Sequence, residues 1–208
     1  MGVFMLKKFF QNARKPEGLG GNVILSKMNY GHARMAEWGF SHINPAENAD
    51  VLDIGCGGGA NLSVFLNKCP KGTVTGIDYS LVSVRKSFGK NKKAIRSGKC
   101  KVIQGDVSNL PFRDNTFDMI TAFETVYFWP DIADAFCEVH RVLQPGGSFM
   151  ICNETDGTSK SDGKWAEIIN GMTVYNKAQL KAYLTEAGFI NIKIFNNRNH
   201  WLCIVANK

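Results

Sequence analysis

The amino-acid sequence predicts an α/β protein built on a mostly parallel β-sheet. First, the apolar run from Val51 to Ile54 leads through several glycines directly into an apolar-patterned helix, which is typical of a buried parallel strand and its crossover helix. Second, further short apolar runs alternate with helical patterns along the chain. Third, strand patterns at 190–195 and 201–206 flank a short polar segment, which predicts a C-terminal antiparallel hairpin.

The chain has the size and composition of one soluble domain. It has 208 residues, a formal net charge of +7 and 44% hydrophobic residues, enough for a substantial core. No apolar run approaches the roughly 18 residues of a membrane span, and the first residues lack the continuous apolar core of a signal peptide, so we expect a cytoplasmic protein. The six cysteines form no C-x-x-C pair and are interpreted as reduced structural thiols, with no metal site.

The segment before the first strand has helical patterns but no strand of its own. Helices are predicted over residues 22–29 and 33–40, and a bend between them holds Tyr30 and His32. Both side chains can be partly buried with satisfied polar tips. A segment without a sheet partner is also well placed to cover a ligand cleft, so a ligand role for this bend is an expectation.

The remaining elements alternate regularly. The helix over 80–93 has Leu81, Val84 and Phe88 on one side, and Pro145-Gly146-Gly147 is expected to stop the helix that begins at 131. The polar connection over 153–173 is long for a compact domain, and such connections are often functional. Strands are predicted over 73–77, 101–104, 117–122 and 148–152, and helices over 80–93, 131–143 and 176–187.

The glycine-rich turn is the predicted ligand loop. A strand that ends in glycines and turns into a helix presents bare backbone and helix N-terminal N–H groups to a ligand. Gly55-x-Gly57-x-x-Ala60 also fits the dinucleotide fingerprint. The carboxylate of Asp53, two residues before the first glycine, would repel a diphosphate and attract a cationic group such as the ammonium of an amino acid, directly or through water.

Acidic residues also follow the second and third predicted strands. Asp78 is placed to accept hydrogen bonds from ribose hydroxyls, as in nucleotide-binding folds, although it or Ser80 could instead cap the following helix. Asp106 can accept a hydrogen bond from the exocyclic amine of adenine, and Val107 offers its backbone N–H. The fourth strand ends in an aromatic-rich segment, 123–129, beside these strand ends.

Together, the segments VLDIGCGGG, GIDYS, QGDVSNLPF and RVLQPGGSF resemble the class I S-adenosylmethionine-dependent methyltransferases. The resemblance runs from about residue 30 to the C-terminus, and it is closest to the small-molecule ubiquinone/menaquinone-methyltransferase-like group. It implies a Rossmann-like three-layer sandwich with a seven-stranded sheet, in which the final hairpin supplies one antiparallel strand. It also implies S-adenosylmethionine as cofactor and S-adenosylhomocysteine as product.

By residue-by-residue analogy, the resemblance assigns parts of the cofactor to this chain. Gly55 and Gly57 would flank the methionine part, Asp78 would hold the ribose, and Asp106 with Val107 would hold the adenine. The expected cofactor-binding residues are Tyr30, Asp53, Gly55, Cys56, Gly57, Asp78, Tyr79, Ser80, Gly105, Asp106, Val107, Phe123 and Glu124. Residues 1–208 would form a single methyltransferase domain, with a helical cover (1–44), a cofactor-binding core (45–153) and a substrate-side loop, helix and hairpin (154–208).

Methyl transfer from this cofactor asks little of a protein, because the sulfonium is an activated methyl donor. The protein aligns a nucleophile in line with the methyl group and excludes water. A general base is needed only if the acceptor must lose a proton before attack. Glu124, Tyr127 and His32 are candidates for that role, and no motif assigns it to any of them.

The acceptor is expected to be a small molecule. Phe123-Glu124-Thr125-Val126 stands where adenine- and amide-nitrogen methyltransferases carry Asp/Asn-Pro-Pro-aromatic, and no Pro-Cys of the cytosine-C5 type follows this strand. The alternatives are an RNA methyltransferase that uses the basic stretch 85–101, a nicotinamide-dependent reductase, and a non-catalytic protein that binds the cofactor. A monomer or a homodimer is expected.

The basic stretch 85–101 is interpreted as a solvated face, and nucleic acid, whose phosphates such a stretch could bind, is the less favoured partner. The stretch contains eight cations and no acidic residue, and such runs are most often solvated faces. Phe88 is its one aromatic residue, which provides little surface for base stacking. The eight cations are Arg85, Lys86, Lys90, Lys92, Lys93, Arg96, Lys99 and Lys101.

Overall fold

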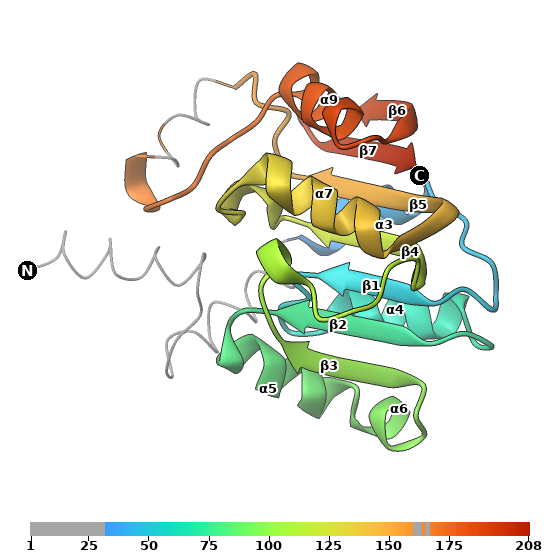
Figure 1. Ribbon diagram of the computed structural model, residues 1–208. Helices are drawn as coiled ribbons and strands as arrows, with labels where there is room; N and C mark the ends of the chain where they lie inside the picture. Colours follow the sequence, from blue (N-terminus) through green and yellow to red (C-terminus); the bar gives the residue numbers. More distant parts are fainter. Residues whose placement is uncertain (1–31, 160–163, 165–166) are drawn as a thin grey trace, which may run out of the picture.

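A seven-stranded sheet with helices on both faces forms the body of the protein (Figure 1). The computed structural model describes residues 32–159, 164 and 167–208. The helix expected over 22–29 and the candidate Tyr30 lie outside the described residues. Within the described part of the chain, no helix is both long and apolar enough to cross a membrane.

The sheet has the order β3-β2-β1-β4-β5-β7-β6. Pairs from β3 through β5 are parallel, and β7 runs antiparallel to both of its neighbours, β5 and β6. The expected mostly parallel sheet with one antiparallel strand from the final hairpin is therefore confirmed. The strands are β1 (Val51–Ile54), β2 (Val74–Asp78), β3 (Cys100–Gln104), β4 (Phe117–Phe123), β5 (Leu143–Asn153), β6 (Ile190–Asn196) and β7 (Leu202–Asn207).

The strand order reverses at β1, which lies between β2 and β4. Crossovers on the two sides of such a point run to opposite faces of the sheet, so a crevice opens at the carboxyl ends of the strands. β1 is buried along its whole length, because both of its faces are covered by helices. The position of the ligand loop after β1 therefore follows from the topology.

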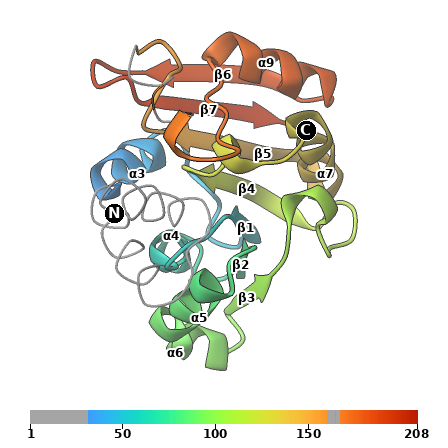
Figure 2. The ribbon, with the colours of Figure 1, turned by 90° about the vertical axis from the view of Figure 1, so that its left-hand side faces the viewer.

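Helices form the two outer layers (Figure 2). α3, α4 and α5 lie on one face of the sheet, whereas α7 and α9 lie on the other and share one apolar core with it. This arrangement confirms the three-layer sandwich. The helices are α3 (Ala33–Phe40), α4 (Ala60–Lys68), α5 (Leu81–Lys90), α6 (Lys92–Arg96), α7 (Ile132–Val142) and α9 (Lys177–Glu186).

α3 is part of the hydrophobic core as well as a wall of the cleft. Met35 is fully buried, and Phe40 packs edge-to-face on Phe65 of α4. Gly39 lies so close to β5 that an added Cβ would be 2.6 Å from the Sγ of Cys152. The described end of the expected N-terminal cover is thus fixed by packing.

The helix expected over 80–93 is broken, and its buried side is polar. α5 ends at Lys90 and α6 begins at Lys92. Ser83 and Ser87 are buried, whereas Leu81 and Phe88 are 45% and 47% exposed. The expectation from the apolar spacing was wrong here, because the small hydroxyl side chains let α5 lie close to the glycine loop.

The end of α7 differs from the sequence prediction, whereas the start of α9 agrees with it. α7 ends at Val142, and Leu143 already pairs with Phe117 of β4. Pro145-Gly146-Gly147 therefore does not stop the helix but lies in an irregular stretch of β5. α9 begins with the expected capping box, in which Asn176 and Gln179 satisfy each other's backbone N–H groups.

Candidate active site

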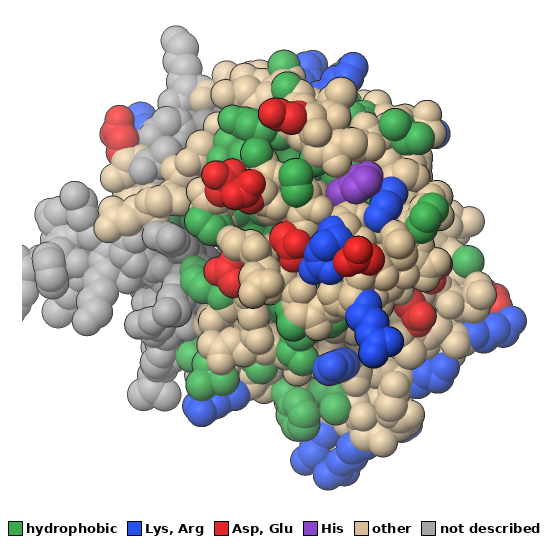
Figure 3. Space-filling model, in the orientation of Figure 1, with side chains coloured by type: hydrophobic (Ala, Val, Ile, Leu, Met, Phe, Trp, Pro, Cys, Tyr) green, Lys and Arg blue, Asp and Glu red, His purple; other side chains and the backbone are tan. Residues whose placement is uncertain are grey.

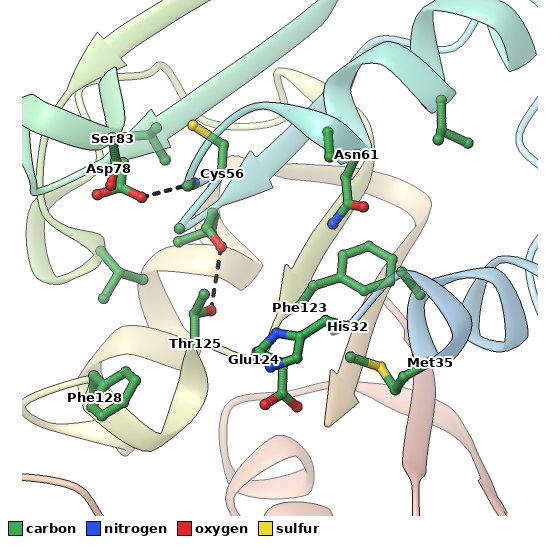
Figure 4. Close-up of a pocket in the computed structure, with 18 of the residues that line it drawn as sticks. His32, Met35, Cys56, Asn61, Asp78, Ser83, Phe123, Glu124, Thr125 and Phe128 are labelled. Atoms are coloured by element: carbon green, nitrogen blue, oxygen red, sulfur yellow. Dashed lines mark hydrogen bonds between the residues drawn. The ribbon is translucent and has the colours of Figure 1, made fainter. Parts of the chain in front are cut away.

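One large cleft opens where the topology places it, at the carboxyl ends of β1, β2 and β4 (Figure 4). Its volume is about 840 Å³, within the range of small-molecule sites. α3, the glycine loop, the end of β2, the turn after β3 and the end of β4 all line it. The cleft is wide enough for a nucleoside cofactor together with a second small molecule.

The glycine loop forms the floor of the cleft, and two of its glycines are required by geometry. Gly55 has a φ of 74°, and a side chain there would clash with Thr125 at the end of β4. Gly59 is the N-cap of α4 with a φ of 75°, and a side chain there would clash with Ser87 of α5. Asn91 holds the loop from below, because its Nδ2 donates to the carbonyl of Gly59 at 3.0 Å.

Asp78 lines the cleft and organises the loop above it. Its Oδ2 accepts a hydrogen bond of 2.9 Å from the N–H of Gly57, and its Oδ1 accepts one of 2.8 Å from the N–H of Ser80. Burial raises the pKa of this carboxyl, and the backbone donors oppose the shift. Ser80 is the N-cap of α5 and accepts from the N–H of Ser83 at 3.4 Å, so the capping role considered for Asp78 falls to Ser80.

Asp53 and Ser80 do not lie in the wall of the cleft. Asp53 is 2% exposed, and the hydroxyl of Thr121 in β4 donates to its Oδ1 at 2.7 Å. Burial raises the pKa of Asp53 to about 7. Asp53 was expected to attract a ligand directly or through water, and its position, bonded to Thr121 and outside the cleft lining, does not provide the direct contact. Ser80 is 1% exposed and is occupied as a helix cap.

The turn after β3 forms one wall of the cleft. Gly105, Asp106 and Val107 line the cleft, as do Cys56 and Tyr79. The Oδ1 of Asp106 accepts from the N–H of Ser108 at 2.9 Å and caps the short turn η1 (Val107–Asn109), which fixes the direction of this exposed carboxylate. Burial, and then the nearby carboxylates of Asp78 and Asp53, raise the pKa of the Cys56 thiol well above its usual range.

Three ionisable side chains lie together: His32 and Glu124, which line the cleft, and Glu154, which is exposed beside them. Their ligand-capable atoms all lie within 4.8 Å of one another, and the Nε2 of His32 is 3.5 Å from the Oε2 of Glu154. They come from the start of α3, the end of β4 and the end of β5. Figure 4 shows His32 beside Glu124, with Phe123 and Met35 around them. We call these three residues the His–Glu–Glu cluster.

Glu124 is held in a defined position within the cluster. Its Oε1 accepts hydrogen bonds from the hydroxyl of Tyr127, at 3.1 Å, and from the N–H of Glu154. Glu124 is one of few non-glycine residues with a left-handed backbone, with a φ of 59°. Such conformations cost free energy and cluster at functional sites.

The surroundings of the cluster change the acidity of its members. Burial, and then the negative charge of Glu154, raise the pKa of Glu124 to about 8. Burial lowers the pKa of His32, and Glu154 opposes that shift. Burial and the neighbouring Glu124 raise the pKa of Tyr127 well above its usual range. At neutral pH the imidazole is therefore uncharged and Tyr127 is a hydrogen-bond donor.

The structure brings together most, but not all, of the residues singled out from the sequence. His32, Phe123 and Glu124 line the cleft, whereas Tyr127 is 3% exposed and acts from behind Glu124. Glu154 was not singled out from the sequence, although it directly follows β5. Asp78, the last residue of β2, and Asp106, two residues after β3, hold comparable positions. Phe128 and Trp129, from the aromatic segment expected beside the strand ends, line the cleft, whereas the apolar side chains of Met35, Phe40 and Val64 were missed.

Comparisons with known proteins agree with this geometry. Residues 52–151 match the family described as methyltransferase domain. A demethylmenaquinone methyltransferase of Staphylococcus aureus is 29% identical over 218 residues, covering 90% of this chain and 86% of the relative. A putative S-adenosyl-L-methionine-dependent methyltransferase of Methanococcus maripaludis superposes with a TM-score of 0.70 at 25% identity, covering 91% of this chain and 92% of the other.

A second solved structure is similar in fold alone. It is the complex between the Trm112 methyltransferase activator of Haloferax volcanii and a putative methyltransferase, with a TM-score of 0.77 at 21% identity. The match covers 90% of this chain and 94% of the other.

A sheet that reverses at β1, with a glycine loop and acidic strand ends around a deep cleft, defines a Rossmann-like α/β protein that binds a nucleoside. Residues 52–151 match a methyltransferase domain, and together with the relatives above this fold supports a class I S-adenosylmethionine-dependent methyltransferase. The expected cofactor and enzyme class are confirmed, and the reductase and the non-catalytic binding protein are set aside. The cradle fits the cofactor, because glycine backbone, an acidic residue after β2 and an apolar wall occur together in it.

Proposed function

We propose that this enzyme transfers the methyl group to a small molecule that binds in the same cleft, at the His–Glu–Glu cluster. The observation that carries the proposal is the shape of the cleft. Its volume is about 840 Å³, and its lining extends from the glycine loop to Glu124 and the apolar side chains of Met35 and Phe128. A cleft of this size has room for a compact organic acceptor beside the cofactor.

The cofactor occupies the end of the cleft near β1 to β3 in this proposal. Gly55 and Gly57 flank its methionine part, Asp78 accepts from the ribose hydroxyls, and Asp106 with Val107 holds the adenine. Each of these residues lines the cleft, which supports the assignment. Asp53 acts on the cofactor through the electrostatic field of its carboxylate, because this side chain is buried beneath the glycine loop.

The protein's own residues supply orientation, water exclusion and a proton acceptor. The bound cofactor supplies an activated methyl group, which is transferred by in-line displacement. Phe123, Phe128 and Met35 form an apolar wall that excludes water around the reacting atoms. Glu124 accepts a proton from the acceptor, and Tyr127 is a positioning residue that holds Glu124 through its hydroxyl.

The position of the basic stretch 85–101 supports a small-molecule acceptor over an RNA acceptor. None of its eight cations lines the cleft. Seven of the eight, all except Lys86, are exposed. In Figure 3 many Lys and Arg side chains lie in the lower part of the view, around α5 and α6. The named relative from Staphylococcus aureus, a demethylmenaquinone methyltransferase, also acts on a small molecule.

A methylation screen tests the proposal. The full-length protein is incubated with S-adenosylmethionine that carries an isotopically labelled methyl group, together with a metabolite extract or total RNA. We expect label in a low-molecular-weight product, and much less of it with Glu124→Gln. Label that appears in RNA, and not in any small molecule, would contradict the proposal.

A further inference from the structure

We propose that the methyl acceptor of this enzyme is an amine, whose nitrogen binds as an ammonium group between Glu124, Glu154 and His32. The inference rests on the proposed function and goes further, because it names the chemical class of the acceptor. It is carried by the charge, the geometry and the reaction chemistry of the His–Glu–Glu cluster.

The first argument is the charge of the cleft. Although the chain carries a net charge of +7, the acidic residues Glu37, Asp78, Asp106 and Glu124 line the cleft, and among the described residues Lys68 is the one Lys or Arg that does so. Lys68 lies in the last turn of α4, whereas the cleft floor is at the first turn. Within the described part of the chain, no Lys or Arg forms an ion pair with Glu124 or Glu154.

Two neighbouring carboxylates without a cationic partner are unfavourable by themselves. The raised pKa of Glu124 reflects this, since Glu154 is one of its causes. A positively charged ligand would relieve the repulsion, and an anionic one would increase it. The site therefore selects against acceptors that react as phenolates, enolates or thiolates, and selects for acceptors that arrive as ammonium ions.

The second argument is geometric. The Tyr127 hydroxyl and the Glu154 N–H both donate to Oε1 of Glu124, and Oε2 has no hydrogen-bond partner among the described residues. Acceptors around a tetrahedral ammonium, each at about 2.8 Å, lie about 4.6 Å apart. The ligand atoms of the cluster lie within 4.8 Å of one another, so one cationic group can contact all three side chains.

A divalent metal ion is the other cation that such a cluster can hold. Neighbouring oxygen ligands of an octahedral ion such as Mg²⁺, each at about 2.1 Å, lie about 3.0 Å apart. The Nε2 of His32 and the Oε2 of Glu154 are 3.5 Å apart, between the metal spacing and the ammonium spacing. The choice of an ammonium group therefore rests on the charge and the reaction chemistry of the site, and a metal titration tests the alternative.

The third argument is the charge that develops during the reaction. The bound ammonium first gives one N–H proton to the carboxylate of Glu124, which leaves a neutral amine with a free lone pair. That lone pair forms the new N–C bond as the C–S bond breaks, and the electrons of the broken bond stay on sulfur. Positive charge therefore moves from sulfur to nitrogen, and Glu154 stabilises it there.

The proposal is tested with matched probes on the enzyme saturated with S-adenosylhomocysteine. Benzylamine, benzyl alcohol and benzoate share a ring and differ in the group that reaches the cluster. By calorimetric titration we expect benzylamine to bind at least tenfold more tightly than the other two. Glu154→Gln should weaken benzylamine by about tenfold, because a charge-assisted hydrogen bond is lost, and leave S-adenosylhomocysteine unaffected.

Glu47→Gln is the control, because Glu47 is exposed, does not line the cleft and pairs only with Lys71. It should bind all three probes as the unmodified enzyme does. If benzyl alcohol or benzoate bound as tightly as benzylamine, the proposal of an amine acceptor would be overturned. Unchanged benzylamine binding by Glu154→Gln would overturn it as well. So would a thermal stabilisation by Mn²⁺ that Glu154→Gln abolishes, because it would show a metal site.

The labelled product from the methylation screen separates this proposal from the one on which it rests. A labelled N-methyl product supports both proposals. A small molecule labelled at oxygen, sulfur or carbon overturns the proposal of an amine acceptor and supports the proposal of a small-molecule acceptor. Label in RNA alone overturns both.

Discussion

The hydroxyl of Tyr127 donates a hydrogen bond of 3.1 Å to the Oε1 of Glu124, from a turn that starts two residues after that carboxylate. The phenol is 3% exposed and reaches Glu124 from the side away from the cleft. Because Tyr127 stays protonated far above neutral pH, it is a permanent donor to the ionised form of Glu124. The pair fixes both the direction and the acidity of the proposed proton acceptor.

Tyr127→Phe should therefore shift the pH dependence of methyl transfer. The hydrogen bond from Tyr127 lowers the pKa of Glu124, against the stronger effect of burial. Its loss raises that pKa further, so activity that depends on ionised Glu124 should appear at higher pH. We expect kcat at pH 7 to fall by about tenfold and to recover in part at pH 9. An unshifted profile of kcat against pH would contradict the positioning role.

Glu124→Gln should remove the pH dependence rather than shift it. With the pKa of Glu124 near 8, kcat of the unmodified enzyme should rise from pH 6 to pH 9. The amide cannot accept the proton, so we expect kcat to fall by about 100-fold and to be flat over this range. The affinity for S-adenosylhomocysteine, measured by calorimetry, should change little.

Asp53→Asn should make the stability of the protein less dependent on pH. The pKa of Asp53 is raised to about 7, above its value in the unfolded chain, so its contribution to stability is present at pH 4 and lost as pH rises through about 7. Asparagine can still accept the hydrogen bond from Thr121 and carries no charge. Denaturant titration at pH 8 should show a gain of about 2–4 kcal/mol in the free energy of unfolding, and at pH 4 a difference near zero.

Asp78→Ala should weaken cofactor binding and also destabilise the ligand-free protein. A hydrogen bond to a charged acceptor contributes about 1.5–3 kcal/mol, so the Kd for S-adenosylhomocysteine should rise about ten- to a hundredfold. The melting temperature should fall as well, because Asp78 accepts from the N–H groups of Gly57 and Ser80.

Ser80→Ala is the matched control for Asp78→Ala. Loss of the cap of α5 costs about 1 kcal/mol of stability, and the hydroxyl does not line the cleft. We expect a lower melting temperature with an unchanged Kd. If Asp78→Ala behaved in the same way, the ribose role of Asp78 would be refuted.

Neutralising Lys90, Lys92 and Lys93 together should leave transfer to the small-molecule acceptor unchanged. All three are exposed and lie outside the cleft. An enzyme that used them to hold RNA would lose affinity, and its salt dependence would become shallower by about one unit of slope per lost phosphate contact. Measuring kcat/KM against salt for the triple variant distinguishes the two cases.

Much of the sheet could be predicted from the sequence, because a buried parallel strand is encoded locally. β1, β4 and the second half of β5 are mostly apolar, and a glycine or a polar residue stands at the carboxyl end of each strand. The capping box at Asn176 is likewise complete within four residues. Such features depend on no distant partner.

The errors concern contacts between distant segments. Asp53 turns away from the cleft because Thr121, 68 residues later, donates to it. The inward side of α5 is polar because Gly59 and Cys56 approach it closely. The His–Glu–Glu cluster joins three segments, and no pattern around Glu154 signals that a histidine lies opposite.

The left-handed backbone of Glu124 has a consequence for how this position responds to selection. Glycine or asparagine accepts such a φ more readily than glutamate does, by about 1 kcal/mol. A library of variants sorted only for folding and heat resistance should therefore drift away from glutamate at position 124. A library sorted for methyl transfer should retain it, so the two outcomes together would measure how much stability the protein gives up for its reaction.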